Sequence, residues 1–256
     1  MARRHLIIPD TQIRPGADTR HIDWAARAII EYKPDVIVHL GDHWDFPSLN
    51  RHSEKGSFEL EGTRYQDDLE AGNDAFRRLV APMEAERARL KRRKLKHWNP
   101  EKFYCFGNHC IRPDRLADGD PKFKGAIGSH QCDTLDWERV PFLEVQVIDG
   151  IRYSHYFQNI NSPRPIGGSI DNRLNRIGES FACGHEQGFL YGNRTFPTGK
   201  VKHGLVAGSF YLHDEKYKGP QGNGHWRGIV ILNEVVDGSY DVMPLSMSYL
   251  ERRFGD

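Results

Sequence analysis

The chain has 256 residues, of which 38% are hydrophobic and 28% charged, and its formal net charge is +1 at pH 7. This composition indicates an ordinary globular chain, large enough to bury roughly three quarters of the surface that it exposes when unfolded. A charge this close to neutral excludes a global electrostatic attraction to nucleic acid, although a local patch can still bind one. No run approaches the ~18 apolar residues of a membrane span and no apolar signal segment follows the start, so we expect a cytoplasmic protein without a membrane partner. The four cysteines form no CxxC pair and are too few for a disulfide framework, so we expect reduced thiols.

The first third of the chain has the pattern of a strand, a helix and a second strand. Residues 4–9 predict a buried strand, and Asp18 is placed to cap a helix whose apolar face repeats at helical spacing up to Tyr32. Lys33-Pro34-Asp35 ends that helix, and residues 36–40 predict a second buried strand. Such a unit favours parallel strands joined by a right-handed crossover.

The next segment predicts a loop, a long helix and a third strand. Residues 46–62 are rich in Ser, Gly, His and charge, which is typical of a loop. A helical stripe extends over residues 63–96, and Pro82 is expected to kink or divide that helix. The third strand is predicted over residues 103–106.

The second half predicts mainly antiparallel strands. Residues 142–148 and 151–157 flank an Asp149-Gly150 turn, which is typical of a hairpin. A short helix is expected over residues 167–177, followed by a strand at Phe181. The remaining strands are expected, as antiparallel ones, over residues 205–212, 228–236 and 240–245. With no repeat or linker in the sequence, we expect one domain, residues 1–256, with a mixed α/β sandwich fold.

Five polar clusters each follow an apolar stretch. They are Asp10-Thr11-Gln12, Gly41-Asp42-His43-Trp44-Asp45, Gly107-Asn108-His109, His155 and Gly184-His185-Glu186-Gln187. Carboxylates, amides and imidazoles at strand ends are the oxygen and nitrogen donors that a divalent metal requires. Any one of these clusters is a weak signal, whereas five in one order predict a metal site.

The order and spacing of these clusters resemble the calcineurin-like metallophosphoesterases, whose pattern is DxH, GDxxD, GNH(D/E), H, GHxH. Gln12 and Gln187 stand where that family usually has His. The resemblance covers nearly the whole chain and implies a four-layer αββα sandwich of two mixed sheets flanked by helices. The DxQ and GHxQ variant also looks like compact phosphoesterases of bacteriophage and bacterial genomes, which would place a phage-encoded chain in the host cytoplasm.

The resemblance implies two divalent ions that share Asp42. The first ion would be held by Asp10, Gln12, Asp42 and Gln187, and the second by Asp42, Asn108, His155 and His185. Two ions about 3.5–4 Å apart can clamp a phosphate and lower the pKa of a bridging water, which then attacks phosphorus in line.

The resemblance assigns His109 to the leaving group rather than to a metal. His109 would stabilise or protonate the leaving oxygen, and Asp45 would orient its imidazole. Asp45 as a simple loop cap is the alternative. Arg112 is a further candidate, since it follows His109 by three residues and could neutralise a phosphate; a surface ion pair is its alternative. Cys110, where the family has an acidic residue, is interpreted as a packing residue.

The two glutamines fall on the same implied ion. A glutamine oxygen is a hard, neutral donor, poorer than imidazole for Zn²⁺ but acceptable to Mn²⁺ or Mg²⁺. We therefore expect an asymmetric pair, with the first site weaker than the second. Mn²⁺ is the favoured ion, with Mg²⁺, Zn²⁺ and Fe²⁺ as alternatives. The other interpretation is that the first site has decayed and one ion remains.

Two further segments are candidates for substrate contact. Seven Lys or Arg residues lie between Arg87 and Lys96, followed by Trp98, which could form a stripe that tracks phosphates. The alternative is a solvated helix end whose cations suit the helix dipole. Residues 208–228, with Trp226, could form a wall of the site, or Trp226 could pin a hairpin to the core.

These features together predict a metal-dependent hydrolase of phosphate esters. A phosphodiesterase or nuclease-like enzyme acting on nucleotides or nucleic acid is the favoured function. A phosphomonoesterase would share every metal ligand and is the first alternative. A binding or assembly module with a weakened first site is the second.

Overall fold

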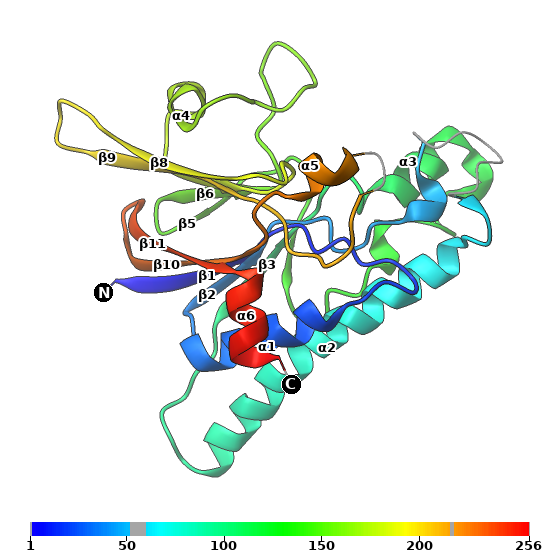
Figure 1. Ribbon diagram of the computed structural model, residues 1–256, viewed down its shortest axis with the longest axis horizontal. Helices are drawn as coiled ribbons and strands as arrows, with labels where there is room; N and C mark the ends of the chain where they lie inside the picture. The colour runs from blue at the N-terminus through cyan, green and yellow to red at the C-terminus, as the bar shows by residue number, and fades with distance from the viewer. Residues whose placement is uncertain (1, 52–59, 216–217, 256) are drawn as a thin grey trace.

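Two β-sheets lie face to face between layers of helices in the computed structural model of the chain (Figure 1). The structure describes residues 2–51, 60–215 and 218–255. The six-stranded sheet has the strand order β11-β10-β1-β2-β3-β4, and the five-stranded sheet has the order β5-β6-β7-β9-β8. The predicted mixed α/β sandwich is confirmed.

The six-stranded sheet contains four parallel strands and an antiparallel edge. Its strands are β1 (Arg3–Ile8), β2 (Val36–His39), β3 (Glu101–Cys105), β4 (Glu138–Val140), β10 (Gly228–Val236) and β11 (Ser239–Ser246). Strands β1 to β4 pair in parallel in chain order. Strand β10 pairs antiparallel with both β1 and β11. The four parallel strands therefore present their carboxyl ends at one edge.

The five-stranded sheet is also mixed. Its strands are β5 (Gln146–Ile148), β6 (Ile151–Ser154), β7 (Phe181–Cys183), β8 (Phe189–Thr195) and β9 (Val201–Ala207). Strands β6, β7 and β9 are parallel neighbours, whereas β5 and β8 pair antiparallel at the two edges.

Helices cover the outer face of each sheet. Helices α1 (Arg20–Tyr32), α2 (Tyr65–Arg92) and α6 (Met247–Phe254) lie on the six-stranded sheet, and α4 (Ile170–Ile177) lies on the five-stranded sheet (Figure 1). Helices α3 (Arg112–Gly119) and α5 (Gly219–Asn223) lie toward the carboxyl ends of the parallel strands. None of the helices in the described part of the chain is long and apolar enough to cross a membrane.

Alternate side chains of the central strands enter different cores. Leu6 and Ile8 of β1 belong to the core under α1, α2 and α6, whereas Ile7 belongs to the core between the two sheets. A third, smaller core joins Phe181 and Val206 to Leu174 of α4. Because both faces of the central strands are buried, these strands are apolar throughout, which is why their sequences were recognisable as buried strands.

The long helix is undivided and shorter than predicted. Helix α2 is continuous from Tyr65 to Arg92 with Pro82 inside it, so Pro82 does not divide the helix, which was one of the two effects expected of it, and the helix ends four residues before Lys96. Proline removes one backbone hydrogen bond from a helix. Leu79 and Met83, on either side of Pro82, are buried in the core and hold both turns in place.

The second half differs most from the prediction. Strand β9 pairs in parallel with β7, so the expectation that it lies only among antiparallel strands is wrong. The partner β8 was not predicted, because Phe189–Thr195 contains Gly192 and Asn193 and alternates between half-buried and exposed positions. The predicted loops over 46–62 and 208–228 include residues 52–59 and 216–217, which lie outside the described residues.

Candidate metal centre

Polar residues from both sheets meet at the carboxyl ends of the parallel strands. Asp10 and Asp42 follow β1 and β2, while Asn108 follows β3. From the second sheet, His155 directly follows β6 and His185 lies two residues beyond β7. The sandwich thus brings together donors that are up to 175 residues apart in the chain.

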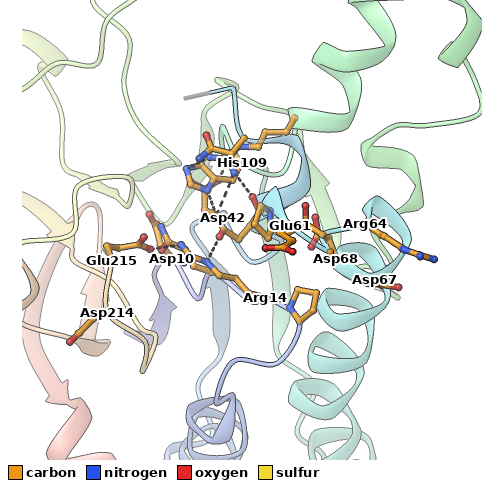
Figure 2. Close-up of a pocket in the computed structure, with 18 of the residues that line it drawn as sticks. Asp10, Arg14, Asp42, Glu61, Arg64, Asp67, Asp68, His109, Asp214 and Glu215 are labelled. Carbon is orange, nitrogen blue, oxygen red and sulfur yellow. Dashed lines mark hydrogen bonds and ion pairs between the residues drawn. The ribbon is translucent and has the colours of Figure 1, made fainter. Parts of the chain in front are cut away.

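These residues lie in or beside a cleft of about 590 Å³, shown in Figure 2. Five of the seven predicted metal ligands line it: Asp10, Gln12, Asp42, His185 and Gln187. The other two, Asn108 and His155, contact these residues directly. His109, Asp45 and Arg112 line the same cleft. The structure therefore brings every predicted site residue into one place, and their individual roles stay predictions.

Asp42, His155 and His185 form a possible metal-binding group, with one donor atom from each lying within 4.8 Å of the others. His155 Nδ1 donates to the carbonyl oxygen of Leu40 at 2.7 Å, so in the neutral ring Nε2 carries the lone pair. That Nε2 lies 2.9 Å from Asn108 Oδ1 and 3.2 Å from Asp42 Oδ2. Several electron pairs thus converge on a small buried volume, which a cation would satisfy.

The electrostatics of His155 and Asp42 indicate the same requirement for positive charge. Burial alone would lower the pKa of His155, but the Asp42 carboxylate beside it raises that pKa to about 9. Burial would likewise raise the pKa of Asp42, but the charges and hydrogen bonds of His155 and His109 hold it well below its usual range. The potential at His155 therefore favours a positive charge, whether that charge is a proton on the ring or a bound cation.

Asp10 and His185 complete the junction between the two sheets. The backbone N–H of His185 donates to Asp10 Oδ1 at 3.1 Å. Burial raises the pKa of Asp10 to about 7. Burial, together with the charge of His155, lowers the pKa of His185 to about 4, so this imidazole is neutral at pH 7 and able to coordinate.

Gln12 and Gln187 each carry a buried side-chain oxygen, Oε1, without a hydrogen-bond partner among the described residues. A buried polar atom left unpaired costs about 1–3 kcal/mol. Two such acceptors, at the two positions where the sequence replaces a histidine, fit a cation as the missing partner. The residues present therefore suit a divalent cation at this position.

The backbone of the site is held in sparsely populated conformations. Gln12, Asp42 and His185 have φ angles of 41°, 48° and 67°. Left-handed conformations cost non-glycine residues on the order of 1–3 kcal/mol each and persist only where surrounding contacts impose them. One such contact is the hydrogen bond from the Gln12 N–H to the Asp42 carbonyl oxygen, at 2.9 Å.

Two motif glycines are required by close approach of the carboxylates. A Cβ on Gly107 would lie 2.0 Å from Asp42 Oδ1, and a Cβ on Gly184 would lie 2.5 Å from Asp10 Oδ1. Both distances are far below van der Waals contact, so any side chain would push the carboxylate aside. The glycines before Asn108 and His185 are therefore explained by packing against metal-donor oxygens.

His109 is fixed on both sides of its ring. Its Nδ1 donates to Asp45 Oδ1, and its Nε2 accepts from Arg112 at 3.2 Å. Arg112 also donates to the Asp45 carbonyl oxygen at 2.7 Å. Burial would raise the pKa of Asp45, but the hydrogen bond and charge of His109 and the nearby guanidinium groups hold that pKa well below its usual range. These contacts favour the interpretation of Asp45 as an anion that orients the imidazole over that of a simple loop cap.

Arg14 was not singled out in the sequence. It donates to Asp45 Oδ2 and to Glu215, and so joins the loop after β1 to the loop after β2 and to the segment before α5. A single arginine two residues after Gln12 carries no recognisable signal, because its two carboxylate partners are 31 and 201 residues away. Glu215 also shows that the 208–228 segment reaches the cleft, through Asp214 and Glu215.

The predicted basic stripe does not lie at the cleft. Asp67 and Asp68, at the start of α2, line the cleft, whereas Arg92 ends the same helix roughly 36 Å beyond Asp68, at about 1.5 Å per residue. Arg87 pairs with Glu84. These contacts favour the interpretation of the stripe as a solvated helix end.

The two tryptophans proposed as substrate contacts are structural. The Trp98 ring packs on the helix-covered core, and its Nε1 donates to the Pro34 carbonyl oxygen at 2.8 Å. Trp226 packs against Phe189, with ring centroids 4.7 Å apart, and is absent from the lining of the cleft. Of the two interpretations given for Trp226, pinning a strand to the core is the one that this packing favours.

Comparison with known proteins yields distant phage relatives. No family model matches the chain. The chain is 38% identical over 85 residues to the "Gene 54 protein" of Mycobacterium phage D29, covering 33% of this chain and 31% of that protein. It is 35% identical over 83 residues to the "Gene 54 protein" of Mycobacterium phage L5, covering 32% of this chain and 31% of that protein. The similarity thus spans about a third of each relative, and their names state no activity.

The close approach of Gly184 to Asp10 predicts the effect of one added methyl group. We expect Gly184→Ala to weaken Mn²⁺ binding about 10–100-fold, because the new Cβ displaces the Asp10 carboxylate. Isothermal titration calorimetry measures this. Gly188→Ala is the matched control, since a Cβ there meets nothing within 4 Å, and it should bind Mn²⁺ like the unmodified chain. Equal affinities in both variants would contradict the assignment of Asp10.

Proposed function

We propose that the protein is a metal-dependent hydrolase of phosphate esters that acts on phosphodiesters. The observation that supports this most is the buried group around Asp42, together with the two unpartnered glutamine oxygens beside it. Divalent ions, when bound, act as Lewis acids toward phosphoryl oxygens and lower the pKa of a coordinated water. The cleft beside this group has room for an ester substrate.

Two unequal ion sites are proposed. Asp10, Gln12, Asp42 and Gln187 would hold the first ion; Asp42, Asn108, His155 and His185 would hold the second. The first set offers only oxygen atoms, two of them neutral, whereas the second includes two imidazoles. Mn²⁺ accepts both kinds of donor and is the favoured ion, with Mg²⁺, Zn²⁺ and Fe²⁺ as alternatives.

His109 would supply the proton for the leaving group, and Asp45 and Arg112 would set the orientation and charge of its imidazole. His109 would deliver a proton from Nε2 to the leaving oxygen, while Asp45 stabilises the charged imidazole and keeps Nδ1 protonated. Arg112 already lies 3.2 Å from that Nε2, so it would turn to the phosphate when His109 is charged, because two cations repel at that distance.

The charge of the cleft favours a diester over a monoester. A diester carries one negative charge, whereas a monoester carries about −1.5 to −2 at pH 7. Arg14, which could have neutralised the second charge, is already held by Asp45 and Glu215. The acidic lining would therefore repel a monoester more strongly.

Direct assay tests the proposed activity. With Mn²⁺ in excess, we expect hydrolysis of bis-p-nitrophenyl phosphate to be faster than that of p-nitrophenyl phosphate. Asp42→Asn should abolish both, because it removes the carboxylate shared by the two sets, and Asp171→Asn on exposed α4 should abolish neither. Faster hydrolysis of the monoester would favour a phosphomonoesterase. Absence of hydrolysis of any ester would favour a binding module.

The role of His109 is tested by changing the leaving group. p-Nitrophenolate leaves without a proton, whereas an alkoxide requires one. We therefore expect His109→Ala to lower kcat about 10²–10⁴-fold for a dialkyl ester and much less for bis-p-nitrophenyl phosphate. Equal losses on both substrates would assign His109 to binding or to the fold instead. Asp45→Asn should reproduce the same selective loss in weaker form.

The asymmetry of the two sites is tested by metal titration. Mn²⁺ added to the metal-free chain should bind with two affinities. Gln12→His should strengthen the weaker step for Zn²⁺, because imidazole is the better zinc ligand and histidine tolerates the left-handed backbone there. Two equal and tight zinc sites in the unmodified chain would refute the asymmetry, and a single step would indicate that one site has decayed.

A further inference from the structure

The cleft extends past the predicted metal donors into an acidic arm, formed by Glu61 in the turn before α2 and by Asp67 and Asp68 in its first turn. Figure 2 shows these carboxylates grouped to one side of Asp42 and His109. Among the described residues, Arg64 is the cation that lines this part of the cleft. A further phosphate group of a substrate would meet a net negative potential in the arm.

Asp68 is the member of the acidic arm that indicates a bound ligand, because it is buried and one of its carboxylate oxygens is unpaired. The residue is 1% exposed, yet it lines the cleft. Its Oδ2 accepts from the N–H and the hydroxyl of Ser48, at 3.0 and 2.5 Å. Its Oδ1 is buried and has no hydrogen-bond partner among the described residues. Since Ser48 satisfies only one oxygen, the other is an acceptor without a donor.

An unpaired buried carboxylate oxygen is costly, and native structures rarely leave one without a reason. Burial raises the pKa of Asp68 to about 6. The hydrogen bonds from Ser48 lower this pKa, and the negative charge of Asp45 raises it further. The influence of Asp45 also means that the acidic arm lies near the residue that orients His109. A donor group of a ligand would supply the missing hydrogen bond to Asp68 Oδ1 and would reduce the repulsion between Asp68 and Asp45.

We propose that the acidic arm binds the alcohol part of the ester through an ammonium or hydroxyl donor that Asp68 Oδ1 accepts. The inference rests on the proposed function and narrows its substrate class. Small diesters with an amine-bearing or hydroxyl-bearing alcohol fit the cleft, whereas a long nucleic acid strand would bring further phosphates against Glu61 and Asp67.

Three p-nitrophenyl diesters of matched size test the inference: the butyl, 3-aminopropyl and 3-hydroxypropyl esters. All release the same phenolate, so differences in kcat/KM report on the alcohol part. We expect the Mn²⁺-loaded chain to prefer the aminopropyl or the hydroxypropyl ester by about tenfold or more, equivalent to about 1.4 kcal/mol. Preference for the amine identifies an ammonium ligand, and preference for the alcohol identifies a hydroxyl ligand.

Asp68→Asn should remove that preference, because it replaces one acceptor oxygen by a donor while the other can still accept from Ser48. Asp74→Asn, on an exposed part of the same helix, should keep it. If Asp68→Asn fails to fold by circular dichroism, the double variant Glu61→Gln, Asp67→Asn takes its place and should reduce the aminopropyl preference. Equal rates on all three esters, or a preference that survives Asp68→Asn, would overturn the inference and leave the proposed function intact. Absence of hydrolysis of every ester would overturn both.

Discussion

The whole site depends on keeping the Asp42 carboxylate charged while it is buried between two sheets. A buried charge is unstable unless hydrogen bonds and opposite charge surround it. Its Oδ1 accepts from the His109 N–H at 2.8 Å, and its Oδ2 lies 3.2 Å from His155 Nε2. Gly107 has no side chain because that space belongs to the carboxylate. Asp42 has a left-handed backbone conformation, which is unfavourable for a non-glycine residue, and with this backbone its side chain points into the junction between the sheets.

The metal donors come from both sheets, so any ion bound there also joins the two layers. Asp42 and Asn108 follow strands of the six-stranded sheet, whereas His155 and His185 follow strands of the five-stranded sheet. The glutamine pair is divided in the same way, with Gln12 after β1 and Gln187 after β7. Ion binding would therefore stabilise the docking of the two sheets, since a ligand that binds only the native arrangement stabilises it.

The central strands, and the polar residues that follow them, could be recognised in the sequence because both signals are local. A strand buried on both faces, such as Val36–His39, is apolar throughout, and the polar residues that follow it mark its end. Partners that are distant in sequence leave no such signal, and Arg14 with Glu215 and Ser48 with Asp68 were found only in the structure. The basic stripe ending at Lys96 was visible in the sequence but its distance from the cleft was not, because that distance is set by the unbroken length of α2.

A cleft proposed to bind an anionic phosphate ester can also contain an acidic arm, because the positive and negative charges lie at different places along it. Ions bound at Asp42 would outweigh the carboxylates that bind them, while the acidic arm of Glu61, Asp67 and Asp68 would stay negative. The cleft would then be positive around Asp42 and negative along the acidic arm, which Figure 2 shows to one side of Asp42 and His109. A substrate with a phosphate at one end and a donor at the other has one favourable orientation in this field. That orientation would place the phosphate at the ions, so the unpaired Asp68 oxygen would contribute to orientation as well as to affinity.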